Sequence, residues 1–229
     1  MTTTDDPSNP RPARPLRRDA QRNRHAIVAA ARQVFCDQGL EAPLEEIARR
    51  AGVGIATLYR RFPSRVELLD AVLADNLQAH IAAAEQALAT DDPWDGFAFY
   101  LEQSCRLQAD DRGLNDVMGM RFPRATAVEA AKTRLFELVG QVVDRAQQSG
   151  QLRADITMED LAFLNWANTR ILPAVRAASA PEAWRRHLGL LLDGFRADRA
   201  HPLPQPPLSP HQVHRAMLTL GRRSAGEGH

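Results

Sequence analysis

Apolar residues in the first third of the chain recur with the period of an α-helix. One such pattern fills residues 19–38 and ends before Gly39, a residue type that often follows the last turn of a helix. Two shorter patterns follow at residues 43–51 and 55–62, and Gly52 lies between them. The pattern predicts a long helix followed by two short helices that are joined by a glycine turn.

Helical periodicity continues through the rest of the chain. Ser64 followed by Glu67 is a capping-box pattern, and neither glycine nor proline then interrupts the sequence before Pro93. These signals predict a helix of about 25 residues that leads from the first unit into a second. Further helices are predicted at residues 94–109, 114–118, 128–148, 157–178, 181–199 and 211–220. Since the sequence lacks the alternation typical of strands, we expect an all-α fold.

Shifts in composition divide the chain into four parts. Residues 1–18 lack periodicity and are expected to form a flexible arm, whose arginines either contact DNA or are merely solvated: Arg11, Arg14, Arg17 and Arg18. We expect a three-helix unit at residues 19–65 and a larger helical domain at residues 66–200. Residues 201–229 form a tail with a proline-rich run and a short final helix.

The composition excludes several classes of function. The 229 residues are 44% hydrophobic and 25% charged, and no apolar run reaches the roughly 18 residues of a membrane span. The N-terminal segment also lacks the apolar stretch of a secretory signal, so we expect a cytoplasmic protein without a membrane partner. Two isolated cysteines and the pair His211 and His214 do not have the spacing of a metal site. Fingerprints of catalysis are missing too, so we expect no metal, no cofactor and no enzymatic activity.

The charge is distributed unevenly along the chain. Residues 1–65 hold twelve arginines against seven acidic residues, whereas residues 66–200 hold fourteen basic residues against twenty acidic ones. A basic N-terminal unit attracts polyanions such as nucleic acid. The charge pattern therefore indicates that the three-helix unit is the part of the chain that binds DNA.

A helix-turn-helix layout is present at residues 43–62, with the sequence PLEEIARRAGVGIATLYRRF. The first short helix positions the second, which has a suitable size to enter the roughly 12 Å wide major groove of DNA. Leu58 and Phe62 are expected to pack the motif onto the preceding helix. The remaining positions supply hydroxyl, guanidinium and apolar groups for phosphates and base edges: Ile55, Ala56, Thr57, Tyr59, Arg60 and Arg61.

This part of the sequence resembles the TetR family of bacterial transcriptional regulators. The resemblance covers about residues 20–70 and rests on Phe35 with Gly39, Leu44-Glu45-Glu46-Ile47-Ala48, Ala51-Gly52-Val53, Thr57-Leu58-Tyr59-Arg60 and Phe62-Pro63-Ser64-Arg65. It implies a three-helix DNA-binding domain, followed by a larger helical domain that dimerises and usually binds a small effector. It also implies that Thr57, Tyr59 and Arg61 contact DNA. Arg65 takes the place of the usual basic residue opening the fourth helix and is therefore a further candidate for DNA binding.

Two positions depart from the family pattern. Ala42-Pro43 stands where the family often has threonine or serine, so a frequent phosphate contact is missing there. Arg61 replaces a common histidine, which strengthens attraction to phosphates but does not define the operator sequence. The second domain resembles the family in its helix pattern, and its Asp92-Pro93-Trp94 start is most similar to an actinobacterial subgroup.

Apolar residues of the second domain have two interpretations. They either pack the core or line an effector cavity, and the candidates for the cavity are Phe97, Tyr100, Met118, Phe122, Phe136, Trp166 and Asn168. Stripes on the last two long helices either pack within the domain or form the two-fold dimer interface that the resemblance implies. The candidates for that interface are Leu164, Leu172, Trp184, Leu188, Leu191 and Phe195.

The sequence thus predicts a sequence-specific, DNA-binding transcriptional regulator. By the resemblance we expect a homodimeric repressor that binds a palindromic double-stranded operator and responds to a small-molecule effector. The alternative is a helical small-molecule carrier or protein-interaction module that no longer binds an operator. Arg60, Arg61 and Arg65 favour the regulator, because a protein without a DNA partner does not need three exposed cations at these positions.

Overall fold

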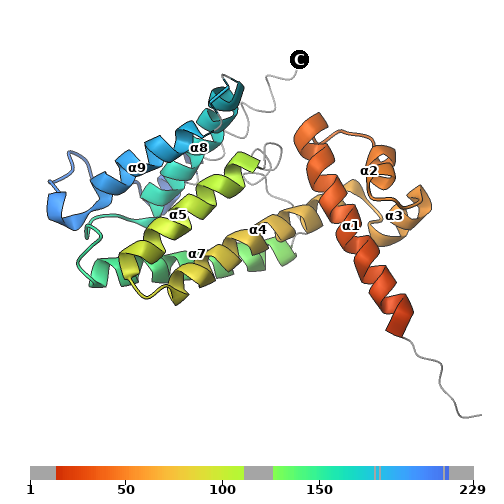
Figure 1. Ribbon diagram of the computed structural model, residues 1–229, viewed down its shortest axis with the longest axis horizontal. Coiled ribbons are helices and arrows are strands. Elements are labelled where there is room, and N and C mark those ends of the chain that lie inside the picture. The colour runs from red at the N-terminus through yellow and green to blue at the C-terminus, as the bar shows by residue number, and fades with distance from the viewer. Residues whose placement is uncertain (1–13, 111–125, 178, 181, 214, 217–229) are drawn as a thin grey trace, which may run out of the picture.

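The computed structural model describes residues 14–110, 126–177, 179–180, 182–213 and 215–216. Its helices are α1 (Arg14–Gln38), α2 (Leu44–Arg50), α3 (Ile55–Arg61), α4 (Arg65–Ala89), α5 (Pro93–Asp110), α7 (Thr126–Gln148), α8 (Met158–Ala177), α9 (Ala183–Phe195) and the 3₁₀ helix η1 (Ala197–Arg199). These residues contain no strand, only an isolated bridge between Leu152 and Arg196, and none of their helices is long and apolar enough to cross a membrane. The predicted all-α fold is confirmed (Figure 1).

Most helices begin and end close to the predicted residues, but α1 is longer than predicted. It begins at Arg14 and not near Asp19, so residues 14–18 are helical and do not belong to a flexible arm. Pro15 is compatible with this start, because the first turn of a helix leaves its N–H groups without intrahelical partners. The predicted helix at residues 114–118 lies outside the described residues. The backbone is helical at residues 210–213 and 215–216, within the predicted final helix.

The first three helices form a small bundle with its own apolar centre. Ile27, Val34 and Phe35 of α1 are fully buried, together with Ile47 of α2 and Leu58 of α3. A fully buried aliphatic or aromatic side chain stabilises a fold by about 1.5–3 kcal/mol relative to its exposed state. This apolar contact fixes α2 and α3 against α1 and leaves their other faces in solvent.

α4 leads from the three-helix bundle into the second group of helices (Figure 1). The Ser64 hydroxyl accepts a hydrogen bond from the Glu67 N–H at 3.2 Å, which is the N-terminal cap that the sequence predicted. α4 contacts α1 near its start and packs against α5 and α7 along the rest of its length. A single helix therefore belongs to both parts of the molecule.

The C-terminal end of α4 is held by an arginine from α7. Arg145 donates to the backbone oxygens of Leu88 at 2.9 Å, Thr90 at 2.7 Å and Asp91 at 2.8 Å. Carbonyl groups at a helix end lack intrahelical partners, and a cation there also interacts favourably with the helix dipole. This clamp joins the end of α4 to α7.

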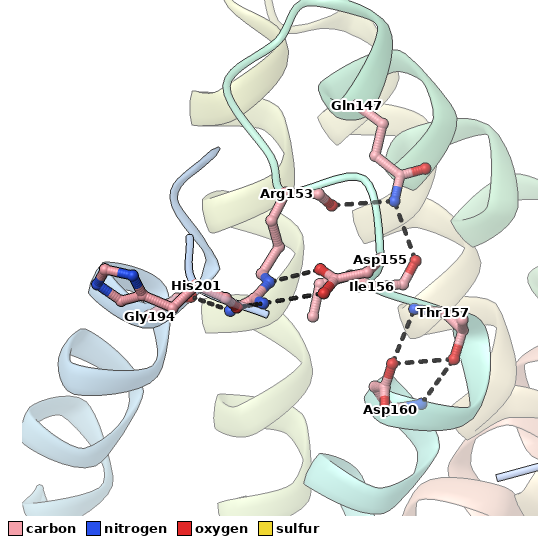
Figure 2. A network of polar contacts seen from close by, with 8 residues as sticks. All are labelled: Gln147, Arg153, Asp155, Ile156, Thr157, Asp160, Gly194 and His201. Carbon is pink, nitrogen blue, oxygen red and sulfur yellow. Dashed lines mark hydrogen bonds and ion pairs between the residues drawn. The ribbon is translucent and has the colours of Figure 1, made fainter. Parts of the chain in front are cut away.

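A buried arginine organises the connection between α7 and α8 (Figure 2). Arg153 donates to both carboxylate oxygens of Asp155, at 2.6 and 2.9 Å, and thereby lowers the pKa of that carboxyl. It also donates to the backbone oxygens of Gly194 at 3.3 Å and His201 at 2.7 Å. Arg153 therefore ties the end of α9 and the start of the C-terminal tail to the α7–α8 connection.

The start of α8 is capped by a reciprocal pair of side chains (Figure 2). The Thr157 N–H donates to Asp160 Oδ2 at 2.9 Å, and the Asp160 N–H donates to Thr157 Oγ1 at 3.4 Å. Gln147 of α7 donates to the backbone oxygens of Arg153 at 3.2 Å and Ile156 at 3.0 Å. The predicted cap at Thr157 is confirmed, and two backbone carbonyls of the loop before it are paired with a side chain of α7.

The contact between α4 and α5 requires glycine at position 96. A β-carbon added to Gly96 would collide with the backbone oxygen of Ala87 near the end of α4. Backbone cannot move aside as a flexible side chain can, so Gly96→Ala is expected to destabilise the fold by about 1–3 kcal/mol. Urea denaturation followed by circular dichroism measures this change in the free energy of unfolding.

Gly140→Ala is the matched control for this experiment. Gly140 lies inside α7, and a β-carbon there meets nothing within 4 Å. Replacing an unhindered helix glycine by alanine gains about 0.5–1 kcal/mol, so this variant is expected to be slightly more stable. Equal stability changes in the two variants would contradict a close approach of α5 to α4.

Candidate nucleic-acid interface

The turn between α2 and α3 is a Schellman motif. Gly52 has a φ of +68°, a left-handed conformation that favours glycine. Its N–H donates to the Arg49 oxygen at 3.2 Å, and the Val53 N–H donates to the Ala48 oxygen at 3.0 Å. These bonds satisfy carbonyl groups that the end of α2 leaves unpaired. The turn thus fixes the direction in which the chain leaves α2 and enters α3.

α3 has a buried side and an exposed side. Leu58 is fully buried, and Phe62 at the C-cap of α3 is also buried. The Tyr59 side chain is 46% exposed. All six positions that the sequence pattern left outside the core do lie outside it: Thr57 is half-buried, and Ile55, Ala56, Tyr59, Arg60 and Arg61 are exposed. The anchoring of α3 by two apolar residues therefore leaves the rest of this short helix free for a partner.

Positive charge is balanced within α2 but not on α3. Glu46 accepts hydrogen bonds from Arg49 at 2.7 and 2.8 Å and from Arg50 at 2.9 Å. These two guanidinium groups lower the pKa of Glu46 to about 2, so the carboxylate stays ionised and offsets their charge. Arg60 and Arg61 take part in none of the ion pairs found among the described residues. The exposed side of α3 thus carries uncompensated positive charge, which attracts phosphates.

Arg65 opens α4, and its guanidinium is engaged inside the protein. Arg65 Nη1 donates to the backbone oxygens of Leu40 at 2.6 Å and Ala42 at 2.7 Å, both in the connection between α1 and α2. The residue is half-buried. Arg65 therefore joins the first turn of α4 to the segment that precedes α2, a contact that the sequence did not predict.

The candidate effector residues lie in different environments. Three are buried, namely Phe97, Tyr100 and Asn168, and Trp166 is half-buried. The Phe136 side chain is 61% exposed on α7, because it lies on the solvent side of that helix, so it does not line an enclosed site. Met118 and Phe122 lie outside the described residues. The structure therefore brings some of the candidates together at the α5–α8 contact and separates Phe136 from them.

Uncharged polar side chains meet where α5 packs against α8. Gln108 Nε2 donates to Asn165 Oδ1 at 2.9 Å, and the Ser104 hydroxyl donates to the same oxygen at 3.4 Å. Asn168 Nδ2 donates to the Cys105 sulfur at 3.1 Å. Burial raises the pKa of the Cys105 thiol to about 11, so the thiol stays protonated and unreactive at neutral pH. We refer to this set as the α5–α8 polar cluster: Tyr100, Ser104, Cys105, Gln108, Asn165 and Asn168.

A repeat of polar residues in the sequence indicates this cluster, although the prediction relied on the apolar residues alone. Tyr100, Ser104 and Gln108 are four residues apart along α5 and so share one face of the helix. Ser104 and Gln108 are buried, although polar residues usually occupy the solvent side of a helix. Polar residues repeated at helical spacing within an otherwise apolar face are therefore the feature that indicates such a cluster.

The candidate dimer residues divide between the interior and the surface of the chain. Leu164, Trp184 and Leu188 are buried within the single chain, Leu191 and Phe195 are half-buried, and the side chain of Leu172 lies outside the described residues. Phe195 packs on Phe97 with ring centroids 6.1 Å apart. Two large apolar side chains that the sequence analysis did not select are exposed instead, Phe163 of α8 at 60% and Leu190 of α9 at 61%.

Comparisons with known proteins cover both parts of the chain. Residues 27–72 match the family described as "Bacterial regulatory proteins, tetR family", and residues 92–197 match the C-terminal domain of SbtR-like transcriptional regulators. A crystal structure of a TetR transcription regulatory protein from Mycobacterium vanbaalenii is 31% identical, with a TM-score of 0.58 over 80% of this chain and 99% of that one. The chain belongs to the TetR family. It is therefore a DNA-binding transcriptional regulator, and the family is not one of enzymes.

Relatives of this TetR-family protein include both a transcriptional repressor and a transcriptional activator. The HTH-type transcriptional repressor KstR of Rhodococcus jostii is 28% identical over 178 residues, which are 75% of this chain and 82% of that protein. The HTH-type transcriptional activator FasR of Mycolicibacterium smegmatis is 41% identical over 76 residues, which are 33% of this chain and 34% of that protein. The long match includes both parts of the chain, whereas the short match covers about a third of it.

Because Arg65 is hydrogen-bonded within the protein, its replacement is expected to lower the free energy of unfolding even without DNA. A residue that contacts only DNA would not have this effect. Arg65→Met keeps the length of the side chain but removes both hydrogen bonds to the α1–α2 connection. A hydrogen bond from a charged donor contributes about 1.5–3 kcal/mol when its partner has no replacement, and partial exposure reduces this value. We expect the free energy of unfolding to fall by about 1–3 kcal/mol in urea denaturation without DNA.

Arg61→Met serves as the control, because Arg61 is exposed and lies in no ion pair among the described residues. Its stability is expected to stay within about 0.5 kcal/mol of the original protein. If Arg65→Met were as stable as Arg61→Met, Arg65 would not hold α4 to the helix-turn-helix.

Proposed function

We propose that this TetR-family regulator is a homodimeric repressor that binds a palindromic operator and releases it when a small molecule binds the second domain. The observation that carries the proposal is the exposed side of α3, which combines hydroxyl, apolar and uncompensated cationic groups. Similarity to the repressor KstR extends over both parts of the chain, whereas similarity to the activator FasR is confined to a short segment. This difference supports repression as the sign of regulation.

The two parts of the chain that α4 joins have different proposed functions. Residues 19–65 bind DNA, with the helix-turn-helix at residues 43–62, and residues 66–200 bind the effector and dimerise. The two family matches support this division, since they end and begin at residues 72 and 92 and leave most of α4 between them. Residues 201–229 form a tail that has no part in the proposed mechanism.

Each exposed group on α3 has a proposed part in binding DNA. The Thr57 and Tyr59 hydroxyls bond to phosphate oxygens, and Arg60 and Arg61 supply charge or contact guanine. Ile55 and Ala56, at the start of α3, meet thymine methyl groups in the major groove. Arg65 has a different proposed part from the sequence prediction, because its Nη1 group is bonded to the α1–α2 connection and so attaches the start of α4 to the segment before α2.

A two-fold dimer explains the apolar groups left exposed on α8 and α9. Phe163 and Leu190 lie on the two helices that carry the proposed interface, and half-buried Leu191 lies beside Leu190. Exposed large apolar groups that lie on adjacent helices indicate a surface for another protein chain. A second copy with two-fold symmetry also places two α3 helices where they can read successive major grooves, about 34 Å apart.

The α5–α8 polar cluster is the proposed place where the effector acts. Two of its hydrogen bonds are weak, at 3.4 Å for Ser104 to Asn165 and to a sulfur acceptor for Asn168, whereas the bond from Gln108 to Asn165 has an ordinary length of 2.9 Å. Side chains joined by weak hydrogen bonds can exchange them for hydrogen bonds to a ligand at a small cost in free energy. α5 also packs against α4 through Gly96, so a change at α5 reaches the helix that leads to the DNA-binding part.

Release of DNA then requires a ligand that prefers the arrangement of helices that does not bind the operator. A shift of α5 displaces α4, and Arg65 carries this displacement to the connection before α2. Coupling of this kind is reciprocal, so the operator must weaken the binding of the effector by the same factor.

Substitutions on α3 test the proposed DNA contacts. The probe is a duplex that the protein selects from a random-sequence library, compared with its scrambled form by fluorescence anisotropy. Tyr59→Phe removes one hydroxyl and is expected to weaken binding about 3- to 10-fold. Arg61→Ala is expected to weaken it on the order of tenfold and to reduce the salt dependence, because each lost phosphate contact lowers the slope of log affinity against log salt by about 0.9.

Arg106→Ala provides the control for the α3 variants, since Arg106 is exposed on α5 and far along the chain from the helix-turn-helix. It is expected to bind the selected duplex as the original protein does. Weak binding to both duplexes that neither α3 variant changes would contradict the proposal and favour a helical carrier without an operator.

The dimer is tested by placing a carboxylate in the proposed interface. Phe163→Glu and Leu190→Glu are expected to shift the protein from dimer to monomer in sedimentation velocity at micromolar concentration, because a charge buried between chains is costly. Phe136→Glu is a control of matched exposure on a different helix, α7. If all three variants remained dimers, the interface would lie elsewhere, and a monomeric original protein would rule out the dimer.

A further inference from the structure

α1 extends beyond the bundle in which it packs. It runs over Arg14–Gln38, but Ile27 is the first buried residue among those α1 side chains that the structure describes, residues 19–38. In Figure 1 the N-terminal half of α1, in red, continues away from α2 and α3. Residues 14–26 are about 20 Å long at about 1.5 Å per residue. We call this part of the helix the α1 extension.

The α1 extension is strongly basic. Its only acidic residue is Asp19, which forms an ion pair with Arg22 one turn later. The side chains of Arg22, Arg24 and His25 are exposed. Its arginines are Arg14, Arg17, Arg18, Arg22 and Arg24. The extension therefore has five arginines against one acidic residue, an excess of positive charge per residue similar to that of α3.

This charge pattern destabilises the helical conformation of the extension. Cations in the first turns of a helix interact unfavourably with the positive end of the helix dipole, and α1 has no acidic residue in its first turn. Like charges spaced four residues apart are also unfavourable in a helix, and the sequence has arginine at positions 14, 18 and 22. A polyanion that lies along the helix offsets both unfavourable interactions, because the positive end of the dipole and the cations both attract it.

The C-terminal end of the α1 extension, where it joins the bundle, lies beside the end of α3. The guanidinium carbon of Arg24 lies 5.5 Å from the centroid of the Phe62 ring, a cation–π contact. Phe62 is the C-cap residue of α3 and directly follows the exposed pair Arg60 and Arg61. The stacking therefore places the base of the extension next to the basic end of the helix that reads DNA.

We propose that the α1 extension is a second DNA-binding element, which contacts the phosphate backbone flanking the major groove that α3 enters. This inference rests on the proposed function, because it requires α3 to engage DNA. A helix of about 20 Å spans about six base pairs of duplex. Contacts of arginine to phosphates position a protein and strengthen binding, but they do not read the base sequence. The extension thus adds affinity and length to the binding site without adding specificity.

The test neutralises three arginines of the extension in the full-length chain. The variant Arg17→Gln with Arg18→Gln and Arg22→Gln retains residues that favour helix, since glutamine and arginine have similar helix propensities. Arg24 is kept, so that its contact with Phe62 is unchanged. The matched control makes the same change at three exposed arginines of the second domain, Arg106, Arg134 and Arg199. Both variants lose the same net charge.

Affinity for the library-selected duplex is measured at four salt concentrations, with the scrambled duplex alongside. We expect the extension variant to bind the selected duplex on the order of 10- to 100-fold more weakly at the lowest salt. Its slope of log affinity against log salt is expected to fall by about 2–3 per protomer, and its preference for the selected over the scrambled duplex is expected to stay unchanged. The control variant is expected to keep the slope of the original protein.

Hydroxyl-radical footprinting of the same complexes provides the second measurement. The original protein is expected to protect backbone outside the α3 sites, and the extension variant is expected to lose this flanking protection while retaining the central one. An unchanged slope with unchanged flanking protection would overturn the inference, as would equal losses in the extension and control variants.

The outcome also separates this inference from the proposed function. If the original protein selects no sequence from the library, the proposed function fails. If it selects one, and the extension variant binds it with an unchanged salt slope and footprint, only the inference about the α1 extension fails.

Discussion

The arrangement of this molecule depends on α4 being held at both of its ends. At the first turn, the Ser64 cap and the Arg65 hydrogen bonds attach the helix to the connection before α2. At the last turn, Arg145 occupies the free carbonyl groups, and Gly96 allows α5 to approach the backbone. In the mechanism proposed above, a helix attached at both ends transmits a displacement of α5 at one end to the helix-turn-helix at the other.

Charged side chains are balanced by their neighbours in several parts of the molecule but not on the proposed DNA-binding surface. Arg153 and Asp155 neutralise each other beside α8, and Glu46 offsets the arginines of α2. On α3 and along the start of α1 the cations greatly outnumber their acidic neighbours. Uncompensated charge reduces the stability of an isolated domain, so its concentration on two neighbouring helices is explained by an anionic partner. α3 lies within residues 27–72, which match the TetR family, whereas the start of α1 precedes that match.

Features that depend on neighbouring residues could be predicted from the sequence. The turn at Gly52 and the caps at Ser64 and Thr157 need only groups a few residues apart, so the order of the helices and the exposed side of α3 followed from spacing. The start of α1 could not be predicted from spacing, because residues 14–18 lack the apolar periodicity that indicates a packed helix. Arginine itself nevertheless favours the helical conformation.

Features that depend on distant residues could not be predicted in the same way. The carbonyl partners of Arg65 and Arg145 carry no signature in the sequence, because any backbone has the same acceptor. An apolar stripe likewise does not indicate whether its partner is the same chain or another. Leu188 is buried within the chain and Leu190 is exposed, although both are leucines of one amphipathic helix.

In the proposed complex, two copies of α3 contact DNA from a two-fold dimer. Methylation interference on the library-selected duplex tests it most directly, because guanine N7 lies in the major groove. A two-fold dimer is expected to give two symmetric clusters of interfering guanines whose centres are about 10–10.5 base pairs, or a multiple of that distance, apart. A single cluster, or interference without two-fold symmetry, would contradict it.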